Sequence, residues 1–129
     1  MRKPKIVMKV LKEDVGYSAS ADIQGNFIAT EGDTLDELIA SVTEAVNLAF
    51  GKGYVKAEEI VLQPDLPSFF EFYKVINVKA LSERIGMNQS LLAQYIKGNK
   101  KPSKNQRERI LKGVHKLGKE LSEIEFVKS

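Results

Sequence analysis

The chain has 129 residues, no cysteine, no tryptophan and a formal net charge of +3. This length fits one ordinary domain or two small ones, because domains mostly run from about 50 to 200 residues. Without cysteine, and with a single histidine, the chain has no disulfide framework, thiolate zinc site or multi-histidine site, and we expect neither a metal nor a cofactor. No apolar run approaches the roughly 20 residues that span a membrane. The basic N-terminus lacks the pattern of a signal peptide, so we expect a cytoplasmic protein without membrane contact.

The small net charge conceals two halves of opposite sign. Residues 1–64 hold seven Lys/Arg and ten Asp/Glu, a net charge of −3, whereas residues 65–129 hold thirteen and seven, a net charge of +6. Opposite signs in two halves of similar length indicate two domains with different partners. A solvated charge imbalance without function is the alternative.

The first half predicts three strands, a helix and a fourth strand. Short β-rich or alternating runs predict the first three strands at 5–11, 17–23 and 27–30. Thr34, followed three residues later by Glu37, has the spacing of a capping box, and apolar residues then recur with helical period as far as Phe50. The apolar run at 60–62 predicts a buried fourth strand.

The second half predicts helices only, so the fold class expected for the whole chain is α+β. Two prolines between residues 63 and 67 indicate the boundary, giving domains 1–64 and 65–129. Ser68 and Glu71 have the spacing of a second capping box, which predicts a short helix to about Ile76. Each further helix follows a residue that caps helix N-termini well: 78–85 after Asn77, 89–97 after Asn88, and a long helix from Lys104 after Ser103.

The most informative segment runs from Val78 to Lys97. Two short predicted helices meet at Gly86, whose missing Cβ permits a sharp turn, and Ser82 supplies a small side chain where helices come close. Apolar residues are spaced to lock the two helices together at Leu81, Ile85, Met87, Leu92 and Tyr95. The segment resembles the helix-turn-helix of Cro and repressor-like proteins, and residues 97–103 resemble that family's loop after the recognition helix.

We expect this segment to bind double-stranded DNA. A recognition helix presents its N-terminal polar residues to base edges, and Asn or Gln can form paired hydrogen bonds with adenine. Lysines in the following loop would lie near phosphates. The predicted DNA-binding residues are Asn88, Gln89, Ser90, Gln94, Lys97, Lys100, Lys101 and Lys104. The alternative is a helical hairpin with a solvated basic face.

The first half resembles the HicB family of antitoxins. The resemblance rests on Tyr17-Ser18-Ala19-Ser20-Ala21-Asp22, on Gly25, and on residues 29–37 with the amphipathic helix that follows; Gln24 stands where the family usually has proline. It implies a partial ribonuclease-H-like fold with three antiparallel strands, a helix, and a fourth strand beside the first. It also implies a C-terminal DNA-binding domain, often a helix-turn-helix.

The resemblance further implies a partner, a HicA-like toxin, which is a small basic ribonuclease that cleaves mRNA. We therefore expect an antitoxin of a type II toxin–antitoxin system, which neutralises that toxin and represses its own operon by binding operator DNA. A stand-alone repressor whose N-terminal domain binds a ligand or oligomerises is the alternative. Residues 13–64 carry a net charge of −8 that suits a basic partner. The candidate toxin contacts are Asp22, Glu31 and Asp33.

We expect no enzyme and no catalytic residue. A ribonuclease-H-like nuclease gathers several carboxylates around divalent metals. Its first strand normally supplies one of them, yet residues 5–11 contain none. His115, on the predicted C-terminal helix, is interpreted as a surface or interface residue rather than a catalytic base.

We expect a homodimer or tetramer, because helix-turn-helix proteins generally bind two half-sites. Apolar residues near the C-terminus are positioned to close such an interface or to cap the domain core: Leu121, Ile124, Phe126 and Val127.

Overall fold

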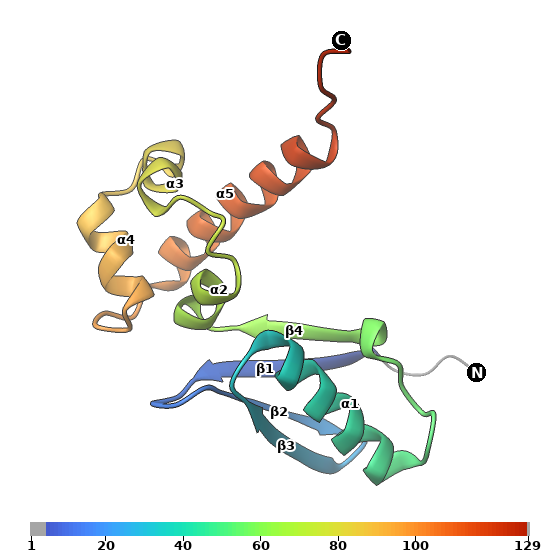
Figure 1. Cartoon of the computed structure of the whole chain (residues 1–129). Helices are drawn as coiled ribbons and strands as arrows, with labels where there is room; N and C mark the ends of the chain where they lie inside the picture. The colour runs from blue at the N-terminus through green and yellow to red at the C-terminus, as the bar shows by residue number, and fades with distance from the viewer. Residues whose placement is uncertain (1–4, 129) are drawn as a thin grey trace. The chain divides into compact units, whose positions relative to one another are not determined.

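The computed structural model describes residues 5–128 and has the expected α+β fold class (Figure 1). None of its described helices is long and apolar enough to cross a membrane. The chain divides into two compact units after Tyr73. In chain order the elements are β1 (Ile6–Lys12), β2 (Tyr17–Ile23), β3 (Asn26–Gly32), α1 (Leu35–Phe50), the short 3₁₀ helix η1 (Ala57–Glu59), β4 (Ile60–Pro64), α2 (Leu66–Phe72), α3 (Val78–Ile85), α4 (Gln89–Ile96) and α5 (Lys104–Ser122).

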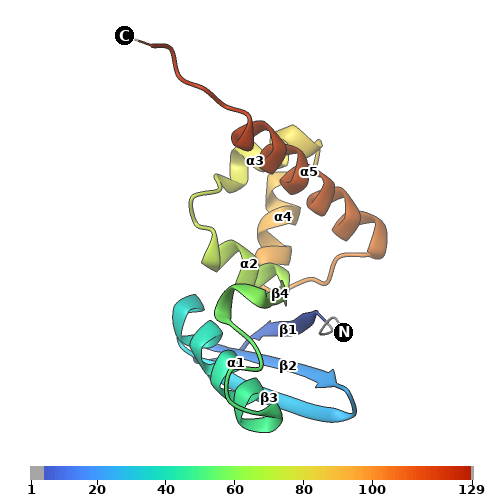
Figure 2. The same ribbon diagram turned by 90° about the vertical axis from the view of Figure 1, so that its right-hand side faces the viewer.

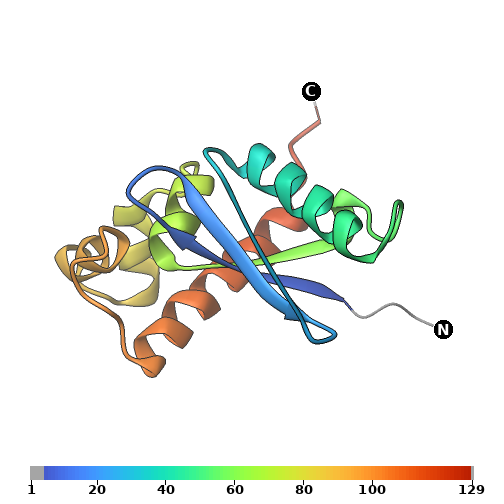
Figure 3. The ribbon, with the colours of Figure 1, turned by 90° about the horizontal axis from the view of Figure 1, so that it is seen from below.

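The first unit, up to Tyr73, is built on a four-stranded mixed sheet in the order β3-β2-β1-β4. Strand β2 pairs antiparallel with β1 and β3, whereas β4 runs parallel to β1 with Ile60 beside Ile6. The expected place of the fourth strand beside the first is therefore confirmed. Helix α1 lies along one side of the sheet, as the view from below also shows (Figure 3). The core contains five fully buried side chains from the sheet and α1: Met8, Val10, Leu38, Val42 and Val46.

Helix α1 begins as the sequence predicts, with one difference in the cap. The hydroxyl of Thr34 accepts a hydrogen bond of 3.2 Å from the backbone N–H of Glu37. The carboxylate of Glu37 accepts from the backbone N–H of Asp33 at 3.0 Å, one residue before the position of a standard capping box. The two bonds fix the passage from β3 into α1.

Helix α2 differs from the prediction at both ends. It runs from Leu66 to Phe72, whereas the sequence predicts a helix that follows a cap at Ser68 and ends at about Ile76. Its cap is Asp65, whose Oδ1 accepts from the backbone N–H of Ser68 at 2.9 Å. The other carboxylate oxygen of Asp65 accepts from the backbone N–H of Lys12 at 3.0 Å. Ser68, the expected cap, is fully buried, and its hydroxyl has no hydrogen-bond partner among the described residues.

These contacts place α2 in the first unit. The ring centroids of Phe72 and Tyr17 are 4.6 Å apart, and Lys12 Nζ lies 3.3 Å from a carboxylate oxygen of Glu71. The units consequently divide after Tyr73 instead of after residue 64. This position sharpens the charge asymmetry, because residues 1–73 carry −5 and residues 74–129 carry +8.

The second unit, from Lys74, contains α3, α4 and α5 (Figure 2). The predicted caps Asn77, Asn88 and Ser103 each accept a hydrogen bond from a backbone N–H in the first turn of the following helix. Helices α3 and α5 approach closely at Gly113, where an added Cβ would overlap Cγ2 of Ile85. Five buried side chains form the small core: Leu81, Met87, Leu92, Tyr95 and Ile110.

Candidate nucleic-acid interface

The turn between α3 and α4 is fixed by backbone hydrogen bonds around Gly86. Gly86 has φ 65° and ψ 33°, a left-handed conformation that glycine adopts without a Cβ penalty. The N–H of Gly86 donates to the carbonyl of Glu83 at 3.2 Å, and that of Met87 donates to the carbonyl of Ser82 at 2.9 Å. This pair of bonds is the Schellman arrangement, which ends a helix and sets the direction of the next segment.

Arg109 of α5 also binds this turn. Its Nε donates to the carbonyl oxygen of Ile85 at 2.9 Å and its Nη2 to that of Gly86 at 2.7 Å. A guanidinium here satisfies carbonyls that have no partner within α3 and complements the negative end of the helix dipole. The sequence does not predict this role of Arg109. The segment contains many basic residues, and no local pattern indicates which of them binds the turn after α3.

Helix α4 has one buried face and one exposed face. Leu92 and Tyr95 are buried, whereas Ser90, Gln94 and Lys97 are exposed. The last three are separated by four and three residues, so they lie on one side of the helix. Gln89, at the first helical position, is exposed as well. The structure therefore places these four predicted contacts where a macromolecule can reach them.

Asn88 has a structural role that limits its use as a base reader. Its Oδ1 accepts hydrogen bonds from the backbone N–H groups of Ser90 at 2.8 Å and Leu91 at 3.2 Å. A paired contact with adenine requires both the oxygen and the nitrogen of the amide. Because the oxygen of Asn88 already caps α4, Gln89 and Gln94 are the better candidates for such a contact.

A basic loop connects α4 to α5. Between residues 97 and 119 the sequence has nine Lys/Arg and one acid, Glu108, and all nine basic side chains are exposed. The loop is held to α4 by the N–H of Asn99, which donates to the carbonyl of Gln94 at 3.0 Å. Like charges gathered on one surface raise its positive potential. The four predicted phosphate contacts belong to this segment: Lys97, Lys100, Lys101 and Lys104.

Arg84 and Glu120 form a second link between α3 and α5. The guanidinium donates two hydrogen bonds to the carboxylate, at 2.9 and 2.8 Å. The hydrogen bonds from Arg84 hold the pKa of Glu120 below its ordinary value. Both side chains are exposed, so we expect their contribution to folding to be modest at physiological salt.

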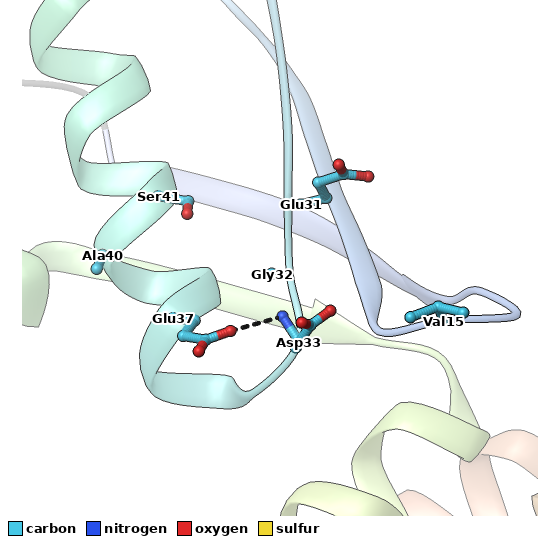
Figure 4. Close-up of a pocket in the computed structure, with 7 residues that line it drawn as sticks. All are labelled: Val15, Glu31, Gly32, Asp33, Glu37, Ala40 and Ser41. Carbon is cyan, nitrogen blue, oxygen red and sulfur yellow. Dashed lines mark hydrogen bonds between the residues drawn. The ribbon is translucent and has the colours of Figure 1, made fainter.

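In the first unit, two of the three candidate toxin contacts border one open hollow of about 550 Å³. Glu31 and Asp33 lie there with Glu37 and the exposed side chain of Val15 (Figure 4). Glu31 lies at the end of β3, Asp33 directly follows this strand, and Glu37 lies in the first turn of α1. The hollow therefore has a negative rim.

Asp22 does not join this group. The strand register places Asp22 opposite Phe27, whereas Glu31 is opposite Ser18. Four residues along a strand correspond to about 13 Å, so Asp22 lies at the other end of the hairpin. No group of three or more His, Asp or Glu side chains that could hold a metal ion occurs within residues 5–128. His115 is exposed on α5.

No protein-family model matches the sequence, and no curated protein or solved structure is significantly similar to this chain.

Proposed function

We propose that the second unit binds double-stranded operator DNA as a Cro/repressor-like helix-turn-helix, with α4 as its recognition helix. The observation that carries the proposal is the exposed face of α4, where Ser90, Gln94 and Lys97 lie opposite the buried Leu92 and Tyr95. A polar face on a short helix suits base edges in the major groove. The basic loop beside it suits the phosphate backbone, whose contacts fix the register of the helix.

The test is binding to the DNA upstream of the chain's own reading frame, measured by fluorescence anisotropy at several salt concentrations. Contacts from Lys97, Lys100, Lys101 and Lys104 predict a steep loss of affinity with salt, a slope of about −0.9 in log–log units per neutralised phosphate. Replacing one of these lysines with alanine should weaken binding to all sequences alike and reduce the slope by about one unit.

Sequence readout is tested by Gln89→Ala with Gln94→Ala. We expect the double variant to lose about 1–3 kcal/mol of discrimination for each paired contact, while its binding to unrelated DNA is retained. Gln63→Ala, an exposed glutamine on β4, is the matched control. Unchanged discrimination in the double variant would contradict the assigned role of α4.

We propose in addition that the first unit is a HicB-like, partial ribonuclease-H-like domain that neutralises a HicA-like toxin. The strand order β3-β2-β1-β4, with a helix after β3 and a parallel β4, supports this proposal. The net charge of −5 up to Tyr73 suits a basic ribonuclease, since opposite charges steer association. The chain would then be the antitoxin of a type II toxin–antitoxin system that represses its own operon as a homodimer or tetramer.

Co-purification with the product of the adjacent gene, followed by an RNA-cleavage assay, tests the antitoxin role. We expect cleavage by that product to stop when the chain is added. Charge reversal at Glu31 and Asp33 should weaken the complex, whereas reversal at Asp22, about 13 Å along the hairpin, should have the smaller effect. An adjacent product that neither binds the chain nor cleaves RNA would contradict the antitoxin proposal and leave DNA binding intact.

The second candidate function is a stand-alone repressor whose first unit binds a ligand. The open hollow bordered by Glu31, Asp33 and Glu37 is the observation that favours it, and its carboxylates suit a cationic molecule. A ligand that changes the affinity of the purified chain for its operator, with no adjacent toxin present, would favour this function over the antitoxin.

A further inference from the structure

Helix α5 carries an apolar stripe that the rest of the second unit leaves largely uncovered. Leu111 and Leu121 are 51% and 62% exposed, and Val114 is half-buried. Together with Gly118 these residues are separated by three, four and three positions. That spacing places them on one side of the helix, as in the seam between two packed helices.

Gly118 is the unusual member of the stripe. Glycine inside a helix is less favourable than alanine, because it loses more backbone freedom on folding. Gly113 of the same helix has an evident reason, the close approach of Ile85. At Gly118 an added Cβ would meet nothing within 4 Å. The monomer therefore provides no packing reason for glycine at position 118.

The stripe is complementary to the same stripe of a second copy when the two helices run antiparallel. A two-fold axis on the stripe side of α5, level with residue 116 along the helix, pairs Leu111 with Leu121 of a second copy, and Val114 with Gly118. The larger Val114 side chain then faces the position without a side chain, which lets the two helices approach closely. Residue-to-residue reciprocity of this kind is what a two-fold interface requires.

The charges beyond the two ends of the stripe fit the same arrangement. Arg107, four residues before Leu111, is exposed. Glu123 and Glu125, which follow Leu121, are exposed as well. In an antiparallel pair the basic end of each α5 meets the acidic end of the other, whereas a parallel pair would place like charges together.

We propose that the chain dimerises through antiparallel packing of α5 against α5 of a second copy, with Gly118 and Val114 at the crossing point. The interface consists of Leu111, Val114, Gly118 and Leu121. It is flanked by Arg107 of one copy and by Glu123 and Glu125 of the other. It lies on the second unit and rests on the self-association included in the proposed function, for which it supplies the surface. Because this interface forms without DNA or toxin, it is tested separately from operator binding.

Sedimentation equilibrium of the full chain without DNA tests this arrangement. We expect a dimer whose dissociation constant rises about tenfold or more in Gly118→Leu, because the new side chains separate the helices. The thermal stability of the dilute monomer should not fall in this variant, since position 118 is open and leucine favours helix. Leu121→Lys should weaken the dimer similarly. Leu48→Lys, at an 87% exposed position near the end of α1, is the matched control and should leave it unchanged.

Charge exchange tests the antiparallel direction. Arg107→Glu in one chain and Glu123→Lys with Glu125→Lys in another should each weaken self-association, because like charges then meet across the axis. Mixing the two variants should restore a dimer containing one copy of each. A chain that stays monomeric up to its solubility limit would overturn the proposal, and so would a dimer that Gly118→Leu leaves unchanged. A dimer that forms but does not bind operator DNA would contradict the proposed function alone.

Discussion

The guanidinium of Arg109 donates a 2.7 Å hydrogen bond to the carbonyl oxygen of Gly86, across 23 residues of chain. This bond joins the first half of α5 to the turn that orients α4. The exposed face of α4 consequently depends on a residue outside both helices of the pair. We expect changes at Arg109 to act on DNA binding through the position of α4 rather than through contact with the nucleic acid.

Arg109→Ala should destabilise the second unit by about 1–2 kcal/mol, because two charge-assisted hydrogen bonds to partly exposed carbonyls are lost. Urea unfolding of the full chain, followed by circular dichroism, measures the change. Lys112→Ala removes the same charge from α5 and serves as the control. Equal stability of the two variants would show that the guanidinium does not hold the turn.

The two glycines of α5 should respond in opposite directions to alanine. Gly113→Ala should lower the free energy of unfolding by about 1–3 kcal/mol, because the new methyl group overlaps Cγ2 of Ile85. Gly118→Ala should raise it by up to about 1 kcal/mol in dilute protein, since the position is open and alanine favours helix. Ile85→Ala removes the methyl group that the new Cβ at position 113 would overlap. The double variant Gly113→Ala with Ile85→Ala should therefore lose less stability than the sum of the two single losses. Additive losses in unfolding free energy would contradict the close approach of α3 and α5.

Local signals were sufficient to predict most of the fold. Thr34, Asn77, Asn88 and Ser103 cap helices as their spacing indicates, because a cap involves only the next three residues. The predicted cap of α2 is wrong, although Asp65 with Pro67 in the first turn is itself a local signal of a helix start. Only the second contact of this carboxylate is non-local. Asp65 also binds the backbone N–H of Lys12, 53 residues earlier, and no local pattern contains that contact.

The candidate site was predictable to a similar extent. Helical periodicity places Ser90, Gln94 and Lys97 on the exposed side of α4, as expected. Arg109 could not be found this way, since its partners are backbone carbonyls of a distant turn. Asp22 and Glu31 are separated because of the register in which β2 and β3 pair. The number of acidic residues in this half of the chain does not predict that register.

Asp65 and Ser68 should differ sharply when each is replaced by alanine. Asp65→Ala should cost the first unit about 1–2 kcal/mol, because it removes a helix cap and the bond to the N–H of Lys12. Ser68→Ala should not lower stability, because its buried hydroxyl forms no hydrogen bond within the described part of the chain. Thermal unfolding of both variants measures the difference, and a larger loss in Ser68→Ala would restore Ser68 as the cap.

The stability of the second unit should decline in acid in part through Glu120. Hydrogen bonds from Arg84 lower the pKa of Glu120 in the folded state, so the unfolded chain takes up this proton first as pH falls. The contribution is complete above the ordinary glutamate pKa of about 4.3 and is lost as pH falls through the lower folded value. Glu120→Gln should reduce the slope of unfolding free energy against pH in that range. Glu108→Gln, on the same helix, is the control, and an equal effect from both variants would argue against the ion pair.

Substitutions at Asn88 distinguish its role as the cap of α4 from a role in contacting DNA bases. Because its Oδ1 caps α4, Asn88→Ser should keep both stability and operator discrimination, as serine caps nearly as well. Asn88→Ala should lose about 1 kcal/mol of stability, and its DNA affinity should fall on every sequence tested. If Asn88 instead reads adenine, Asn88→Ser will lose discrimination at one base pair while its unfolding free energy stays unchanged. Parallel measurement of unfolding and of binding to operators with single base changes separates the two roles, because a lost cap disturbs the first turn of α4 whatever the DNA sequence.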